Sequence, residues 1–433
     1  MTQGEYAYNL AAELFPICRS ITGNGVRKTL KILQREVPEL KIKEVPSGTQ
    51  VFDWTVPKEW NITDAWVKDK NGSKIIDFSE TNLHVMGYSI PVHKTVTLNE
   101  LMSFIYTEPE QPDVIPYITS YYKERYGFCI SENQKIQMLS TYSGNDEFEI
   151  YIDSTLENGS LTYGEIIIPS TEKNNKEIFI STYICHPSLA NNELSGPCVS
   201  ITLAKWLKNL KKRKYTYRLI YIPETIGSIT YLSKNYKELQ NNVIAGFNLT
   251  CVGDDRTYSY MPTAYGNTLA DKVLQNVLSF HFPEYKKYSF LISGSDERRY
   301  SAPGIDLPVV GFSRSLYSKY PEYHTSADNL SLISPSGLQG SFDVISKCIT
   351  ALEWNANYKM TCLCEPQLGK RGLYPTVSRK GQYDEVFRLK NLISYLNGKN
   401  DLIDVSNIIK VSIEEIIETL KKLKENNLIK EVV

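Results

Sequence analysis

Several features that would point to a secreted or membrane protein are missing from this chain. Its eight cysteines are scattered without a CxxC pair, and a chain of 433 residues does not depend on disulfides, so we expect reduced thiols. No apolar run reaches the roughly 18 residues that cross a bilayer. The N-terminus lacks the basic and then apolar pattern of a signal peptide. These absences predict a cytoplasmic protein without a membrane partner.

An excess of charge of either sign is also missing. The 48 basic and 49 acidic side chains leave a net charge of -1, which argues against a protein built chiefly to bind nucleic acid. Hydrophobic residues make up 42% and charged residues 22%, as in ordinary globular proteins. The length predicts two or three domains.

The order of predicted elements divides the chain into three parts. Residues 1–45 have helical periodicity, whereas residues 46–157 are rich in β-formers separated by turn signals. From about residue 160 strands alternate with helices, the pattern of a mostly parallel or mixed sheet flanked by helices. We therefore expect an α/β domain from 1–45 and 158–358, an inserted β-rich domain at 46–157, and a linker with a further domain at 359–433.

The last segment has the pattern of a winged helix-turn-helix. Three amphipathic stretches precede the final NLIKEVV, and Ser412 with Glu415 predicts a capping box at the start of the third helix. This stretch carries both lysines and glutamates, and the mixed charge favours a protein partner or plain packing over DNA. The oligomeric state stays open, and a homo-oligomer is compatible with the sequence.

Polar side chains follow the ends of the predicted strands. In EIFISTYICHPSLANNELSG, residues 177–196, an apolar strand ends at His186, and Glu193 follows in the next turn. Similar positions after later strands hold Glu224, Asp254, Asp296 and His324. Because the carboxyl ends of parallel strands share one edge of a sheet, we expect these side chains to converge.

Two imidazoles and a carboxylate, with a fourth position open for water, make a catalytic zinc site. We predict His186, Glu193 and His324 as ligands of about one Zn²⁺ per chain. Glu224, flanked by apolar residues that raise its pKa, is the predicted general base. The predicted substrate-binding residues are Asp296, Asp254, Asn192 and either Arg298 or Arg299, and each of them also has a purely structural interpretation.

These residues are similar to those of the zinc aminopeptidase family that also includes glutaminyl cyclases. The resemblance aligns His186 with the first histidine, the segment 192–196 with an Asp-Asn-x-Ser-Gly turn, Glu224 with the glutamate at a strand end, and His324 with the final histidine. Asn192 and Thr250 stand where that family has metal-binding aspartates. The resemblance therefore implies one metal rather than two, in a set that resembles the mononuclear His-Glu-His site of zinc carboxypeptidases.

A closer resemblance covers nearly the whole chain. The segments FPICRSITGNGVRKTL, CHPSLANNELSGP, PETIGSI, LTCVGDD and YHTSADN resemble those of a bacterial aminopeptidase-like family with an inserted domain of unknown function and a C-terminal winged helix. Members of that family are linked with polysaccharide biosynthesis, which implies an amide on a sugar or a peptide as substrate.

The sequence supports hypotheses of different classes. The first is a zinc-dependent hydrolase of a peptide or amide bond, aminopeptidase-like or carboxypeptidase-like. The second is a non-catalytic binding or regulatory protein on a degenerate peptidase scaffold, in which the winged helix contacts protein or DNA. A third, a carbohydrate-binding role of the inserted segment, rests only on Trp54, Trp60 and Trp66.

Overall fold

The computed structural model describes residues 1–373 and 383–432. The chain separates into two compact units, Met1–Gly266 with Lys286–Phe342 and Asn267–Tyr285 with Asp343–Val433. This division leaves the three domain boundaries expected from the sequence as a prediction.

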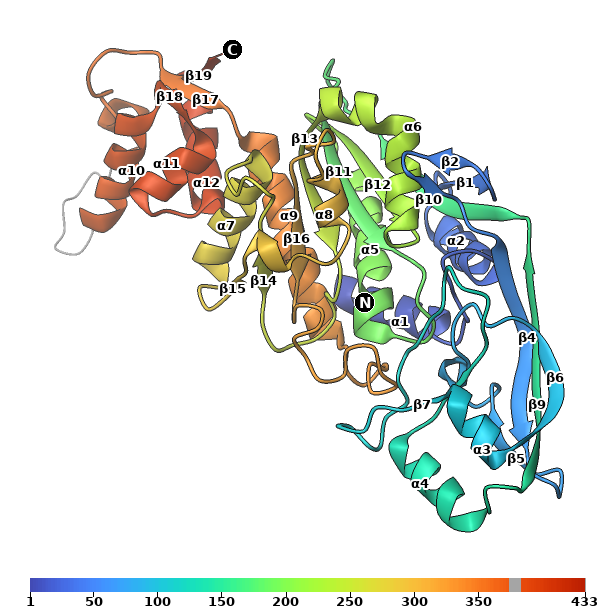
Figure 1. Ribbon diagram of the computed structural model, residues 1–433. Coiled ribbons are helices and arrows are strands. Elements are labelled where there is room, and N and C mark those ends of the chain that lie inside the picture. The colour runs from blue at the N-terminus through green and yellow to red at the C-terminus, as the bar shows by residue number, and fades with distance from the viewer. Residues whose placement is uncertain (374–382, 433) are drawn as a thin grey trace. The chain divides into compact units, whose positions relative to one another are not determined.

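An eight-stranded sheet forms the centre of the first unit (Figure 1). Its order is β1 (Lys41–Pro46), β10 (Ser160–Ile168), β12 (Thr216–Ile222), β11 (Glu177–Tyr183), β13 (Val243–Leu249), β16 (Val309–Ser313), β14 (Ser259–Met261) and β15 (Lys286–Lys287). The four strands β12, β11, β13 and β16 pair in parallel, while β1, β10 and β14 join antiparallel. The predicted mixed sheet flanked by helices is confirmed.

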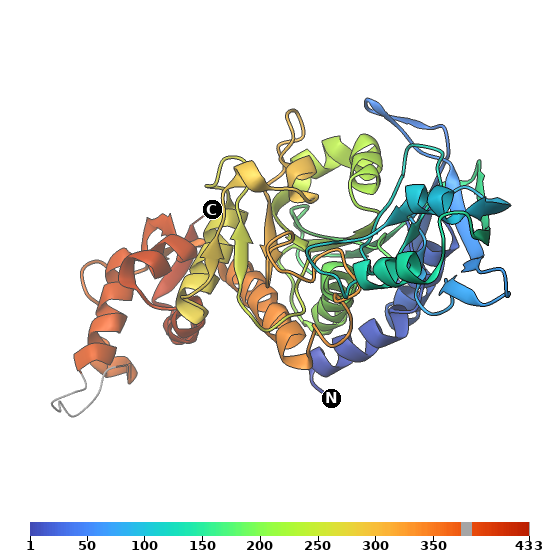
Figure 2. The same ribbon diagram turned by 60° about the horizontal axis from the view of Figure 1, so that its bottom comes forward.

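Helices cover both faces of this sheet. Figure 2 shows α1 (Gln3–Leu14) and α5 (Ser195–Asn209) on one face and α6 (Ile226–Asn242) on the other. The unit also contains α2 (Asn24–Glu36), α8 (Glu297–Tyr300), the short helix η4 (Phe290–Ile292) and the first part of α9 (Pro335–Trp354). All seven residues of β11 are buried, as expected of a strand covered on both faces.

The inserted segment forms its own antiparallel sheet within the first unit. The sheet order is β5 (Lys74–Asp77), β4 (Glu59–Lys68), β9 (Glu147–Glu157) and β6 (Val92–Thr97). Shorter elements are β2 (Gln50–Val51), β3 (Trp54–Thr55), η1 (Asn82–His84), α3 (Leu98–Leu101), η2 (Met102–Phe104), β7 (Ile105–Tyr106), β8 (Phe128–Cys129) and α4 (Glu132–Thr141). Buried residues alternate along β9, so one face of this sheet packs on a small core that includes Phe128, Phe148 and Ile150.

The second unit combines helices with a three-stranded sheet. Its elements are α7 (Leu269–His281), β17 (Asn357–Met360), η5 (Gly369–Arg371), α10 (Tyr383–Tyr395), β18 (Asn397–Asp401), α11 (Leu402–Ile409), α12 (Ile413–Glu425) and β19 (Ile429–Val432). Ser412 caps α12 as predicted, since its hydroxyl accepts from the Glu415 amide. The Glu415 carboxylate accepts from the Ser412 hydroxyl at 3.1 Å and not from the Ser412 backbone amide, so the reciprocal bond of the predicted capping box is not formed. The helices, followed by a terminal strand, agree with the predicted winged helix-turn-helix.

No helix within residues 1–373 and 383–432 is both long enough and apolar enough to cross a membrane.

Candidate functional site

His186 and Glu224 meet because their strands are parallel neighbours. The last residue of β11, Tyr183, pairs with the last residue of β12, Ile222, and both side chains follow within three residues. The His186 Nε2 and Glu224 Oε2 atoms are 3.9 Å apart. The ring of His324, from the loop after β16, lies 5.3 Å from the His186 ring, centroid to centroid. The structure thus brings together three of the predicted site residues.

Glu193 approaches His186 from its other ring nitrogen. It lies on a π-helical turn, η3 (Ala190–Leu194), a rare conformation that often marks functional sites. Its Oε2 lies 2.7 Å from His186 Nδ1, and both side chains are almost fully buried. A buried Arg19 donates from Nε to the His186 carbonyl at 3.0 Å and lies 3.9 Å from Glu193 Oε1. Burial opposes a charged imidazole, but the carboxylates of Glu193 and Glu224 outweigh it and raise the pKa of His186.

Several buried polar atoms at this edge of the sheet have no hydrogen-bond partner. In the described part of the chain they include Glu193 Oε1, His324 Nε2, Asp296 Oδ2 and Asn192 Oδ1. Buried polar atoms are almost always paired in folded proteins, so a cluster of exceptions calls for a bound ion, water or ligand. The first two are atoms of predicted ligands, and imidazole nitrogen and carboxylate oxygen are donors that zinc prefers. The donor types present therefore suit a zinc ion, whereas the group of potential ligand atoms that lie within 4.8 Å of one another comes from Cys185, His186 and Glu193 and does not include His324.

Cys185 adds a sulfur atom that the sequence analysis did not single out. One potential ligand atom each from Cys185, His186 and Glu193 lies within 4.8 Å of the others. Burial, reinforced by the charges of Glu193 and Glu224, raises the pKa of the Cys185 thiol well above its usual range. Cys185 Sγ also accepts from the Glu224 backbone amide at 3.2 Å, so it connects the His186 strand end to the Glu224 strand end.

Glu224 combines partial exposure with a raised pKa. Its side chain is 26% exposed, and its Oε1 accepts from the Ser295 hydroxyl at 2.8 Å. Burial raises the pKa of Glu224, as the sequence predicts for a general base, although the charge of His186 works against this shift. The group is thus reachable from solvent and close to the imidazoles.

Asp296 lies behind Glu224 and is fully buried. Its Oδ1 accepts from the Thr225 amide at 2.9 Å and from the Ser228 hydroxyl at 2.7 Å. Burial and the nearby Glu224 charge raise the pKa of Asp296 to about 7. Of the two arginines that the sequence left open, Arg299 donates to Thr225 Oγ1 at 2.9 Å, and the assignment of either one as a substrate-binding residue stays a prediction. Arg298 is exposed and donates to the Ser293 carbonyl.

Several residues at or near the site have backbone conformations with positive φ. Thr225 and His324 have φ values of 62° and 57°, and Ser188 and Cys251 nearby have values of 39° and 53°. Such conformations are unfavourable for residues other than glycine and persist mainly where function requires them. Positive φ values also occur elsewhere in the described chain, as at Lys410 and Asn427, so the strain accompanies the site without identifying it.

Asp254 and Asn191 belong to a saturated hydrogen-bond network. Asp254 accepts from the Asn191 side chain, from the Arg256 amide, and from the amide and hydroxyl of Ser315. These four bonds occupy the acceptor capacity of a carboxylate and give Asp254 a structural function. Its assignment as a substrate-binding residue stays a prediction.

The two positions where the resemblance departs from the aminopeptidase pattern lie side by side. The Asn192 side chain donates to the Tyr183 hydroxyl at 2.8 Å, and the same hydroxyl is hydrogen-bonded to Thr250 Oγ1. A neutral triad thus stands where that family has two metal-binding aspartates. The number of metal ions that the site binds stays a prediction.

Asp328 is a site-forming residue to which the sequence analysis assigned no role. Its carboxylate accepts from the backbone amides of Asn191 and Asn192 at 2.6 and 3.0 Å and from the Tyr320 hydroxyl at 2.9 Å. It therefore ties the turn that carries Glu193 to the loop that carries His324. Burial raises the pKa of Asp328 to about 6. Its proximity to His324 in YHTSADN was the available signal.

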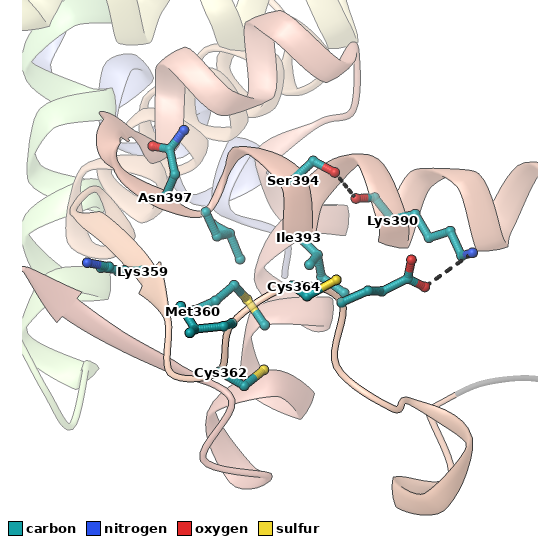
Figure 3. A pocket seen from close by; sticks show the side chains of 11 residues that line it. Lys359, Met360, Cys362, Cys364, Lys390, Ile393, Ser394 and Asn397 are labelled. Atoms are coloured by element: carbon teal, nitrogen blue, oxygen red, sulfur yellow. Dashed lines mark hydrogen bonds and ion pairs between the residues drawn. The ribbon is translucent and has the colours of Figure 1, made fainter.

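A separate pocket of about 380 Å³ lies in the second unit (Figure 3). Lys359, Met360, Cys362, Cys364 and Lys390 are among its lining residues. Lys390 pairs with Glu365 at 3.2 Å. The lining contains none of the predicted site residues, so the catalytic hypothesis concerns the first unit alone.

Comparisons with known proteins agree with this fold. Residues 8–355 match the model of a domain of unknown function, DUF4910, and residues 356–431 match a winged helix-turn-helix. A Clostridium acetobutylicum protein named "Putative polysaccharide biosynthesis protein with aminopeptidase-like domain" is 48% identical over 407 residues, which are 94% of this chain and 91% of that protein.

Two solved structures superpose on this chain and show which known fold it has. The crystal structure of a "putative peptidase" from Clostridium acetobutylicum superposes with a TM-score of 0.91 at 46% identity, over 99% of this chain and 96% of the other. A zinc aminopeptidase from Bacillus subtilis superposes with a TM-score of 0.56 at 14% identity, over 81% and 94% of the two chains. The chain therefore belongs to the DUF4910 family, with a winged helix-turn-helix after that domain and the fold of the zinc aminopeptidases.

Proposed function

We propose that this protein is a zinc-dependent hydrolase that cleaves a peptide or amide bond. The observation that carries the proposal is the group of unpartnered buried atoms around His186, of which Glu193 Oε1 and His324 Nε2 belong to predicted ligands. A site without a ligand would leave these atoms desolvated and unpaired, which is unfavourable by about 1–3 kcal/mol for each group.

In the proposed site, His186, Glu193 and His324 would hold about one zinc ion per chain. When bound, zinc supplies Lewis-acid chemistry that polarises the carbonyl of the bond to be cleaved. Glu224 accepts the proton of the attacking water at Oε2, the oxygen that is not bonded to Ser295. Its raised pKa suits a base that later returns the proton to the leaving amine.

Glu193 has two interpretations that differ in one measurable property. Its Oε2 is hydrogen-bonded to His186 Nδ1. In many metal sites a carboxylate that does not bind the metal itself orients a metal-binding histidine in this way. Glu193 Oε1 faces Arg19 at 3.9 Å but accepts no hydrogen bond, so it could bind a metal. If Glu193 is a ligand, Glu193→Gln loses zinc at stoichiometric concentrations. If it only orients His186, the variant keeps zinc with an affinity lowered about 10- to 100-fold.

We propose that the protein acts in the cytoplasm. We also propose that it acts in polysaccharide biosynthesis, a proposal supported by the name of the Clostridium acetobutylicum relative. The substrate would then be a peptide or an amide on a sugar. We propose that the winged helix contacts a protein rather than DNA, because α12 carries acidic residues in its first turn and basic residues in its last. This pattern also complements the helix dipole.

The test is the zinc content of the purified, tag-free protein beside that of a His186→Ala/His324→Ala variant. We expect about one zinc per chain, lost in the double variant and kept in His93→Ala, whose side chain is 61% exposed and remote in sequence from the site. Zinc-loaded protein would then be screened against peptides and acylated amino sugars.

A second candidate function is supported by the neutral triad of Asn192, Tyr183 and Thr250. Asn192 and Thr250 replace the aspartates that the resemblance leads one to expect. Such a replacement is typical of a non-catalytic binding or regulatory protein on a peptidase scaffold. Protein that binds no zinc even when zinc is supplied would contradict the hydrolase and favour this alternative.

A further inference from the structure

A loop of the inserted segment reaches the candidate site. The chain between β7 and β8 passes beside the loop that carries His324, where Pro116 and Thr325 form an isolated β-bridge. The Tyr117 amide donates to the His324 carbonyl at 2.8 Å, and Ser326 bonds to Ile115 through both its amide and its hydroxyl. The insertion is therefore part of the site's architecture.

Tyr117 stands against both imidazoles. Its ring centroid lies 5.1 Å from that of His186 and 5.1 Å from that of His324, with edge-to-face geometry in each case. Its hydroxyl is 2.5 Å from the hydroxyl of Tyr121. This residue forms a wall of the proposed catalytic centre and connects it to the aromatic residues of the insertion.

From Tyr117 a row of aromatic side chains leads toward solvent. Tyr121 contacts Tyr122 at 6.2 Å between ring centroids, and Tyr122 contacts Trp54 at 5.9 Å. Tyr122 is 57% exposed and Trp54 is 40% exposed. We call Tyr117, Tyr121, Tyr122 and Trp54 the aromatic strip. Single exposed aromatic residues need no explanation, but a continuous set that begins at a catalytic centre indicates a ligand surface.

The side chains of the aromatic strip favour a sugar ring over an extended peptide as ligand. Each ring combines an apolar face with a hydroxyl or N–H group at its edge, which complements a sugar ring, whose C–H face is apolar and whose rim carries hydroxyls. An extended peptide would instead seek free backbone groups. Along this loop the amides of Tyr117, Ser120 and Lys123 already donate to carbonyls of the chain.

We propose that the aromatic strip binds a sugar ring of the substrate next to the site of cleavage. The substrate class would then be an amide carried on a saccharide rather than a free peptide. This inference rests on the proposed hydrolase function for the identity of the cleaved bond, but the binding of the sugar itself does not require hydrolysis.

The test is direct binding, measured by calorimetry and by tryptophan fluorescence on the full chain with and without zinc. The probes are a tetramer of N-acetylglucosamine and an end-blocked tetra-alanine peptide. We expect the sugar to bind and the peptide not to bind. Trp54→Ala and Tyr122→Ala should each weaken sugar binding at least tenfold.

Matched controls are Trp66→Ala, a change on the same insertion outside the strip, and Tyr265→Ala, which removes a tyrosine that is 73% exposed. Both should leave sugar binding unchanged. The proposal would be overturned if the protein bound only the peptide or neither probe. It would also be overturned if the control variants weakened sugar binding as much as the strip variants do. Sugar binding by protein that holds no zinc would support the strip while contradicting the hydrolase, so the two failures are distinguishable.

Discussion

Strands β11 and β12 carry a cluster of charged side chains at each end, and the two clusters differ in how completely they are paired. At the starting end Arg218 bonds to Glu177 at 2.6 Å, to Glu165 at 2.9 Å and to Glu238 at 2.5 Å. At the other end, around His186, buried polar atoms of Glu193 and other residues lack hydrogen-bond partners.

This difference suggests that the charged residues at the first end stabilise the fold, whereas those at the other end bind a ligand. A buried charge whose hydrogen bonds are complete leaves nothing for a ligand, and its removal affects mainly folding. A buried cluster with free acceptors is incomplete without a ligand, and its removal should affect binding and turnover more than folding. Variants at the two ends of the same strands test this distinction.

The largest expected effect is on turnover at the unpaired end. Glu224→Gln removes the proposed base and should lower kcat about 10²- to 10⁴-fold on the amide substrate found in the screen. Zinc content and thermal stability should stay close to those of the unaltered protein. Glu238→Gln, at the paired end and 54% exposed, is the matched control and should keep full activity. Full activity of Glu224→Gln would remove this residue from the mechanism.

The next effect is on folding at the paired end. Arg218→Met leaves Glu165 and Glu177 buried without their cation, which should lower the free energy of unfolding by about 3–5 kcal/mol. Urea denaturation measures this loss, and zinc content of the folded protein should not change. Loss of zinc in a folded Arg218→Met protein would show that the two clusters are coupled. Glu238→Gln, which removes only an exposed partner, should lower stability by less than about 1 kcal/mol.

A smaller effect is expected at the neutral triad. Tyr183→Phe removes the hydroxyl that pairs with Asn192 and Thr250, which should cost about 1–3 kcal/mol of stability because buried polar groups lose their partner. Zinc stoichiometry should stay the same if the triad replaces a second metal position. Tyr221→Phe, a buried tyrosine with a 3.1 Å bond from Ser200, is the matched comparison. A changed zinc content in Tyr183→Phe alone would place the triad in the metal site.

The smallest effect is a change in acid stability. Burial opposes ionisation of Glu165, but its hydrogen bonds with Lys43 and Tyr231 outweigh burial and lower its pKa from the ordinary value of 4.5. The stability that this shift contributes is present above pH 4.5 and is lost as the pH falls through the lowered pKa. Glu165→Gln should therefore be less stable at neutral pH and lose less stability on acidification, as measured by denaturation at several pH values. An unchanged acid dependence would assign the loss to other carboxylates.

The sequence was sufficient to predict the strand-end residues. His186 and Glu224 follow apolar strands in the chain, and the rule that parallel strands end at one edge brings them together. The alternation of strands and helices likewise predicted the mixed sheet, and the capping residue Ser412 predicted the start of α12. These signals are local, so one sequence contains them.

Other parts of the site depend on contacts distant in sequence. Tyr117 is 69 residues from His186 and reaches it only because the insertion folds back onto the His324 loop. Arg19 lies beneath His186 from the N-terminal segment, and whether Arg298 or Arg299 reaches Thr225 depends on which side of a one-turn helix faces that residue. No periodicity or motif encodes such packing.

The attachment of the insertion has an evolutionary consequence. The chain leaves the central sheet after Pro46 and returns at Ser160, and these two residues are cross-strand partners in the β1–β10 ladder. A hairpin turn would join them just as well. New sequence spliced into such a turn breaks no ladder hydrogen bond, and lengthening a surface loop has only a small entropic penalty. The central sheet could thus have acquired the inserted segment in one step, with its strand-end residues left in register.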